Sequence, residues 1–194
     1  DTIKLSSGRV VDAYSYYSSD GEKWWKNSMG MIKDAVHFRS ALIGEYPFNV
    51  VTAVEAPIGF EGGMEYPTIT SISPLPDEKS LDITIGHEIG HNWFYGILAS
   101  DERRYPWLDE GVNTYYDKRY QEWKYGTNQS REKKSSFISN KLPDSEDLLA
   151  INSLAKIKKD QPINTPSADF SETNYSVIAY AKAAYTFQQL EKYI

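Results

Sequence analysis

His87-Glu88-Ile89-Gly90-His91 is the stretch that decides the fold of this 194-residue sequence. It reads H-E-x-x-H, and residues four apart on a helix lie on the same face with Cβ atoms roughly 6 Å apart. Two imidazoles at that spacing can both bind one metal ion at about 2.0–2.1 Å. Glu88 lies about 100° round the helix from His87. It is therefore placed to take a proton from a metal-bound water rather than to bind the metal itself.

A catalytic zinc site needs a third protein ligand and one open position. The segment 107–111 supplies acids, and eighteen residues separate His91 from Glu110. A helix, a turn and an antiparallel helix would return Glu110 to the side of His91, so we predict Glu110 as the third ligand. Asp109 is the competing choice, although it faces another side of the same helix. The remaining histidine, His37, is interpreted as a structural residue of an ordinary helix.

Apolar periodicity predicts the elements around this motif. Strands are predicted over 10–18, 48–54 and 68–72, and helices over 24–43, 77–98, 107–124 and 175–194, with 128–170 helical in part. Gly44 and Gly126 are the expected stops of two of these helices. Because strands occur only in the first half, we predict one α+β domain over 1–194, with an α/β lobe over about 1–105 and a helical lobe over about 106–194.

Composition and charge exclude several classes of function. The net charge of -6 and the pI of about 5.1 argue against a nucleic-acid partner, which requires a basic face. The sequence has no cysteine, so disulfides, thiolate zinc sites and cysteine nucleophiles are excluded. No apolar run approaches the ~18 residues that span a bilayer, so no transmembrane segment is expected. The aromatic content of 14% favours a packed fold over a disordered chain.

Four motifs together resemble the gluzincin aminopeptidases, the family of aminopeptidase N and leukotriene A4 hydrolase. The first is H-E-x-x-H followed after eighteen residues by E. The other three are Gly62-Gly63-Met64-Glu65, which resembles G-x-M-E-N, His91-Asn92-Trp93-Phe94, which resembles H-Q-W-F, and Tyr180-Ala181-Lys182-Ala183-Ala184, which resembles Y-x-K-G-A. The motifs run from residue 62 to 184, and the resemblance covers nearly the whole chain.

The resemblance implies a thermolysin-like zincin fold with the zinc helix at the floor of the cleft. It implies one Zn²⁺ per chain, bound by His87, His91 and Glu110. Glu88 would be the general base that activates the water and later protonates the leaving amine. Tyr180 would donate a hydrogen bond to the oxyanion, and such a donor is typically worth about 3–4 kcal/mol. Tyr175, five residues earlier, is the alternative tyrosine.

The resemblance also implies a substrate. Glu65 would bind the free α-ammonium group of a peptide, and Gly62, Gly63 and Met64 would line the same pocket. A carboxylate that pairs with the N-terminal amine places the first peptide bond over the metal, which makes the enzyme an aminopeptidase. The expected partners are peptides with a free N-terminus and the flanking domains of the family, one β-rich and one helical.

Three positions depart from the family pattern. Tyr66 stands where the family has Asn, Asn92 stands for Gln, and Ala183 stands for Gly. The family's Asn helps to hold the substrate end, so Tyr66 keeps a thermolysin-like endopeptidase open as an alternative. A metal-stabilised binding scaffold without catalysis is the other alternative.

Overall fold

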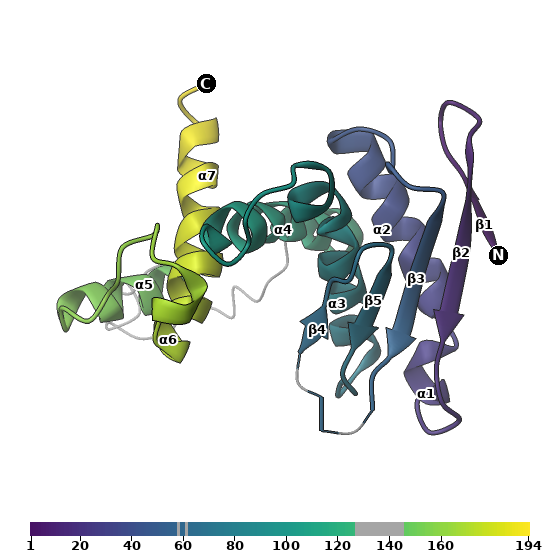
Figure 1. Cartoon of the computed structure of the whole chain (residues 1–194), viewed down its shortest axis with the longest axis horizontal. Coiled ribbons are helices and arrows are strands. Elements are labelled where there is room, and N and C mark those ends of the chain that lie inside the picture. The colour runs from purple at the N-terminus through teal and green to yellow at the C-terminus, as the bar shows by residue number, and fades with distance from the viewer. Residues whose placement is uncertain (58, 61, 127–145) are drawn as a thin grey trace. The chain divides into compact units, whose positions relative to one another are not determined.

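The computed structural model describes residues 1–57, 59–60, 62–126 and 146–194. It consists of two compact units, Asp1–Ala99 (unit 1) and Ser100–Ile194 (unit 2) (Figure 1). Within these described residues, no helix is both long and apolar enough to cross a membrane.

Unit 1 is built on a five-stranded mixed sheet with the order β1-β2-β3-β5-β4 (Figure 1). The strands are β1 (Thr2–Lys4), β2 (Val10–Tyr16), β3 (Val50–Glu55), β4 (Gly63–Met64) and β5 (Ile69–Ile72). β2, β3 and β5 run parallel, and β1 and β4 pair antiparallel at the two edges. The three predicted strands are confirmed as β2, β3 and β5. β1 and β4 were not predicted, because segments of 3 and 2 residues carry no readable alternation.

Helices α2 (Ser28–Leu42) and α3 (Glu78–Gly90) cover one face of this sheet (Figure 1). Along β2, Val11 and Ala13 are fully buried, whereas the alternate residues point to the other face and are exposed. This period of two is the expected pattern of a strand with one covered face. The sheet therefore fixes the position of α3, the helix that carries the two histidines.

The predicted single helix over 24–43 is wrong, because the chain forms α1 (Glu22–Trp25) and then α2. The break between them is held by Ser28, which is 1% exposed. Its hydroxyl lies 2.5 Å from the carbonyl oxygen of Trp25 and 2.6 Å from Oγ of Ser15 on β2. This contact ties the start of α2 to the sheet. Gly44, with φ of +134°, follows the end of α2 as predicted.

The predicted helix over 77–98 is confirmed only as far as Gly90, where α3 ends. The π-type segment η1 (Asn92–Ile97) follows, and its backbone leaves the helical region at two residues. Tyr95 has φ of +89°, and a right-handed helix cannot continue through that conformation. The amide of Gly96 then donates to His91 O at 2.8 Å, and a Cβ on Gly96 would lie 3.0 Å from that oxygen. Glycine therefore permits the turn that closes the histidine helix.

Among its described residues, unit 2 contains helices and no strand. They are η2 (Trp107–Gly111), α4 (Val112–Tyr125), α5 (Glu146–Lys156), η4 (Ser167–Asp169), α6 (Glu172–Asn174), η5 (Tyr175–Lys182) and α7 (Ala183–Glu191). The predicted helix over 107–124 is confirmed as η2 and α4, which stop before Gly126 with φ of +78°.

The last predicted helix, over 175–194, is confirmed as η5 and α7. Ile178 and Ala181 are buried, whereas Leu190 is 52% exposed. Leu190 lies in the last turn of α7, one residue before the helix ends. The partly helical stretch predicted over 128–170 is confirmed at α5, and its part over 128–145 lies outside the described residues.

Candidate metal centre and active site

Helix α3 begins at a strong cap. Asp77 accepts hydrogen bonds from the backbone amide of Ser80 at 2.8 Å and from its hydroxyl at 2.9 Å. The bond from the amide holds the pKa of Asp77 below its usual range. An apolar stripe then fixes the rotation of the helix, since its members are at most 1% exposed: Leu81, Ile85 and Ile89. The stripe faces the core and leaves another side of the helix for the histidines.

His87 and His91 face each other across one turn at the end of α3. Their Nε2 atoms are 3.2 Å apart, and their ring planes are perpendicular with centroids 4.8 Å apart. Two nitrogens bound to one zinc at 2.0–2.1 Å in tetrahedral geometry lie about 3.3–3.4 Å apart. His91 is 1% exposed, whereas His87 is half-buried. The pair therefore fits one tetrahedral metal ion that is reached from the side of His87.

Glu88 lies between the histidines in sequence and is 5% exposed. Its carboxylate is pressed against the backbone of β4, because a Cβ built on Gly63 would lie only 1.9 Å from Glu88 Oε1. A side chain at position 63 would therefore require the Glu88 carboxylate to move. The close approach of β4 to α3 was not predicted from the sequence, although the Gly62-Gly63 pair was its signal.

Glu65, Glu88 and His91 come together in unit 1, with ligand atoms all within 4.8 Å of one another. Glu65 directly follows β4, whose Met64 carbonyl accepts a hydrogen bond from Thr70 Oγ1 at 3.1 Å. Gly62 precedes β4 with φ of +79°, a conformation that favours glycine. The glycine-rich segment thus places the carboxylate of Glu65 beside α3, the helix that carries the two histidines.

Glu110 lies in unit 2 on η2 and is 7% exposed. The neighbouring Asp109, the competing ligand, begins a row of buried polar residues at i, i+4 and i+8 that continues with Asn113 and Asp117 on α4. The row was not predicted from the sequence, although its helical spacing is readable there. The carboxylate oxygens of Asp109 and Glu110 nevertheless lie within 4.8 Å of each other, so Asp109 stays the competing candidate for the third ligand.

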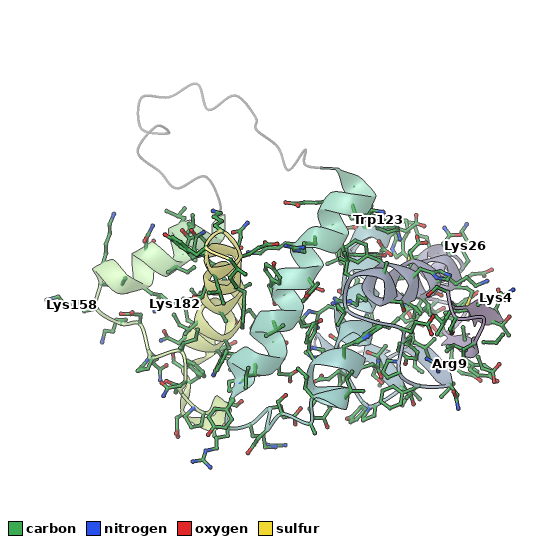
Figure 2. The ribbon with its side chains drawn as sticks, turned by 90° about the horizontal axis from the view of Figure 1, so that it is seen from above. Lys4, Arg9, Lys26, Trp123, Lys158 and Lys182 are labelled. Carbon is green, nitrogen blue, oxygen red and sulfur yellow. The ribbon has the colours of Figure 1, made fainter. Side chains whose placement is uncertain are left out.

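Tyr180 lies on η5, also in unit 2, and is half-buried. Its ring packs edge to face against Tyr175, the alternative tyrosine, at a centroid distance of 5.7 Å. Lys182 of the same motif points away from the helix and lies 3.6 Å from the carboxylate of Asp160 (Figure 2). The structure therefore places two members of the predicted set in unit 2, Glu110 and Tyr180. The other members lie in unit 1, and a metal ion shared by the histidines and Glu110 stays a prediction.

Gly111 couples the segments that carry Glu110 and Tyr180. A Cβ at this position would lie 2.3 Å from the Cβ of Ala183 and 2.8 Å from the carbonyl oxygen of Ala179. Gly111→Ala is therefore expected to destabilise unit 2 by about 1–3 kcal/mol through overpacking. Denaturant unfolding measures the loss. Adding Ala183→Gly should leave the double variant less destabilised than the sum of the single variants, and strict additivity would contradict the contact.

An H-E-x-x-H helix packed on a mixed sheet, with an acid-bearing helix following it, defines the class of zinc-dependent hydrolases. Residues 33–194 match the family model "Peptidase family M1 domain". The chain therefore belongs to peptidase family M1. The resemblance drawn from the motifs is confirmed by this match.

The proteins with similar sequences include aminopeptidases and leukotriene A-4 hydrolase. The chain is 26% identical over 122 residues to leucine aminopeptidase 2-2 of Scheffersomyces stipitis, a match that covers 61% of this chain and 19% of that protein. It is 33% identical over 88 residues to leukotriene A-4 hydrolase of Xenopus laevis, covering 44% and 14%. It is 32% identical over 93 residues to human aminopeptidase B, covering 46% and 14%. The chain thus spans less than a fifth of these relatives.

Solved structures confirm the α+β fold class. The M1 zinc metallopeptidase of Deinococcus radiodurans matches with a TM-score of 0.65 at 16% identity, over 100% of this chain and 39% of that one. A variant of that metallopeptidase bound to the substrate Tyr-Ser-Ala matches with a TM-score of 0.60 at 17% identity, over 98% and 39%. Membership of a family of zinc metallopeptidases implies zinc, and the histidine pair fits that ion.

Proposed function

We propose that this protein is a zinc aminopeptidase that hydrolyses the N-terminal peptide bond of peptides. The observation that carries the proposal is the group of Glu65, Glu88 and His91, whose ligand atoms lie within 4.8 Å of one another in unit 1. A single zinc peptidase site needs a base beside the metal, and an aminopeptidase can use a carboxylate to bind the free amine. Both carboxylates are present beside His91.

His87 and His91 would hold one zinc ion per chain, and the sequence spacing supports Glu110 as the third ligand. When bound, zinc polarises the scissile carbonyl and lowers the pKa of a bound water to about 7. The donor set suits this metal, because two imidazoles and a carboxylate leave the fourth position open. The sequence has no cysteine, so no thiolate can serve as a ligand in place of these residues.

The remaining steps are proposed for residues of this chain. Glu65 pairs with the α-ammonium group of the substrate, and the backbone around Gly62, Gly63 and Met64 lines the same pocket. Glu88 accepts the proton of the attacking water and passes it to the leaving amine. Tyr180 donates its phenolic proton in a hydrogen bond to the oxyanion that develops on the scissile carbonyl.

The test compares one peptide in two forms. Tyr-Ser-Ala and its N-acetylated form are incubated with the protein at its full encoded length, with and without a chelator. We expect release of Tyr from the free peptide only, loss of this activity with chelator, and recovery when zinc is restored. Equal cleavage of the acetylated peptide would remove Glu65 from its proposed role.

A thermolysin-like endopeptidase is the second candidate, and Tyr66 is the observation that favours it. Tyr66 is 54% exposed and stands where the family pattern has Asn beside the amine-binding Glu. A longer N-acetylated peptide separates the two candidates, because an endopeptidase cuts it at internal bonds. If neither peptide is cut while zinc is present in the sample, the binding scaffold becomes the leading interpretation.

A further inference from the structure

Asn92, the residue directly after His91, uses both ends of its side-chain amide inside the protein. It is 6% exposed. Its Nδ2 donates to the carbonyl oxygen of Ile89 at 3.0 Å, at the end of the histidine helix. Its Oδ1 accepts from the backbone amide of Thr68 at 3.0 Å. One partner is only an acceptor and the other only a donor, so the orientation of the amide is fixed by these contacts.

Thr68 ends the segment that carries Glu65. It has φ of +65°, which is an outlier for a β-branched residue. Its carbonyl oxygen accepts from the amide of Thr52 on β3 at 2.8 Å, so both of its backbone groups are bonded. Three residues before it, Glu65 follows Met64, whose carbonyl oxygen is bonded to Thr70 Oγ1. The Glu65 segment (residues 64–68) is thus held at both ends, and Asn92 holds the end that reaches α3.

We propose that Asn92 is a positioning residue that fastens the Glu65 segment to the end of the histidine helix. It thereby sets the separation between the carboxylate for the free α-amino group and the base and metal site at Glu88 and His91. This inference rests on the aminopeptidase function proposed above. The separation matters because a substrate anchored at its amine presents its first peptide bond at one distance only, and a shift of about 1 Å can cost 100-fold in rate.

The amide chemistry suggests a pair of variants that separate the two bonds. Asn92→Asp keeps an oxygen that can accept from the Thr68 amide but removes the donor to Ile89. Asn92→Leu keeps the branching at Cγ, with a larger side chain, and removes both bonds. Thr84→Val is the matched control, because it removes a hydrogen bond of α3 from Thr84 Oγ1 to Ser80 O at 2.9 Å that does not touch the segment.

The kinetic test uses Tyr-Ser-Ala and its N-acetylated form. We expect Asn92→Leu to lower kcat/KM for the free peptide on the order of tenfold, mainly through kcat, and to lose selectivity against the acetylated form. Thr84→Val should stay within about twofold of wild type, and Asn92→Asp should be less impaired than Asn92→Leu, because it keeps the acceptor for the Thr68 amide. Zinc content, measured by metal analysis, should be unchanged in all three variants.

A second readout needs neither zinc nor substrate. Amide hydrogen exchange at Thr68 should be faster by at least about tenfold in Asn92→Leu and remain slow in Asn92→Asp and Thr84→Val. Wild-type exchange at Thr68 in Asn92→Leu would overturn the proposal, and so would equal impairment of the two Asn92 variants. If the wild-type protein cleaves neither peptide, the proposed function falls, and the role of Asn92 is then decided by the exchange of Thr68 alone.

Discussion

Glu88→Gln is expected to lower kcat by about 10²–10⁴-fold while leaving the zinc content unchanged. Gln has nearly the same shape as Glu but cannot take a proton from the attacking water. Glu88 is 5% exposed and its carboxylate lies against β4. Bulk water therefore has little access to this position and cannot easily act as the base in place of Glu88. The histidines on either side are untouched, which is why the metal should stay. Initial rates at saturating Tyr-Ser-Ala and metal analysis of the same sample measure the two effects.

Glu78→Gln provides the matched control for this prediction. Glu78 lies in the first turn of the same helix, and its Oε1 accepts from Asn27 Nδ2 at 2.6 Å, a bond that Gln can also accept. The control should keep wild-type kcat. Turnover of Glu88→Gln within tenfold of wild type would exclude Glu88 as the base, and loss of zinc from it would mean that Glu88 supports the metal site instead.

The parts of the fold that were predictable are those with a local signal. β2 alternates Val11 and Ala13 inward with exposed residues between them, and that period of two is readable without a structure. The stop of α4 at Gly126 is also local, because glycine readily adopts a positive φ. The break between α1 and α2 was missed, because it depends on Ser28 reaching Ser15 on another element. Apolar periodicity carries no information on such a contact.

The candidate site likewise has features that were predictable from the sequence and features that were not. The two histidines are paired by a four-residue spacing, so their facing geometry follows from the helix alone. Glu65 reaches His91 only because β4 pairs antiparallel with β5 at the sheet edge, and a strand of 2 residues leaves no pattern in the sequence. The amide of Asn92 meets Thr68 across 24 residues, and only the folded sheet brings them together. The residue types of the candidate site were therefore readable in the sequence, whereas the contacts that hold them in place required the structure.

Gly63→Ala is expected to reduce kcat/KM by about 100-fold with little change in the unfolding transition. The added Cβ would lie 1.9 Å from Oε1 of Glu88 and 2.3 Å from its Cδ, so one of the two must move. The carboxylate is the flexible end of a side chain, and a shifted rotamer costs about 0.5–1.5 kcal/mol. Moving the strand would instead disturb the pairing of Gly63 with Ile72, which is fully buried. The Glu88 side chain should therefore move, and its carboxylate would no longer be placed to take the proton from the attacking water.

Gly30→Ala introduces the same methyl group where it meets nothing within 4 Å, on the exposed side of α2. This control should keep wild-type kinetics and gain about 0.5–1 kcal/mol in unfolding free energy, because Ala is the better helix former. The decisive comparison places Gly63→Ala in the Glu88→Gln background. If the methyl group acts by displacing the base, the double variant should be no slower than Glu88→Gln alone, since a base already lost cannot be lost again. A further 100-fold drop in the double variant would show that position 63 acts on the substrate rather than on Glu88, and would shift its role to the lining of the amine-binding pocket.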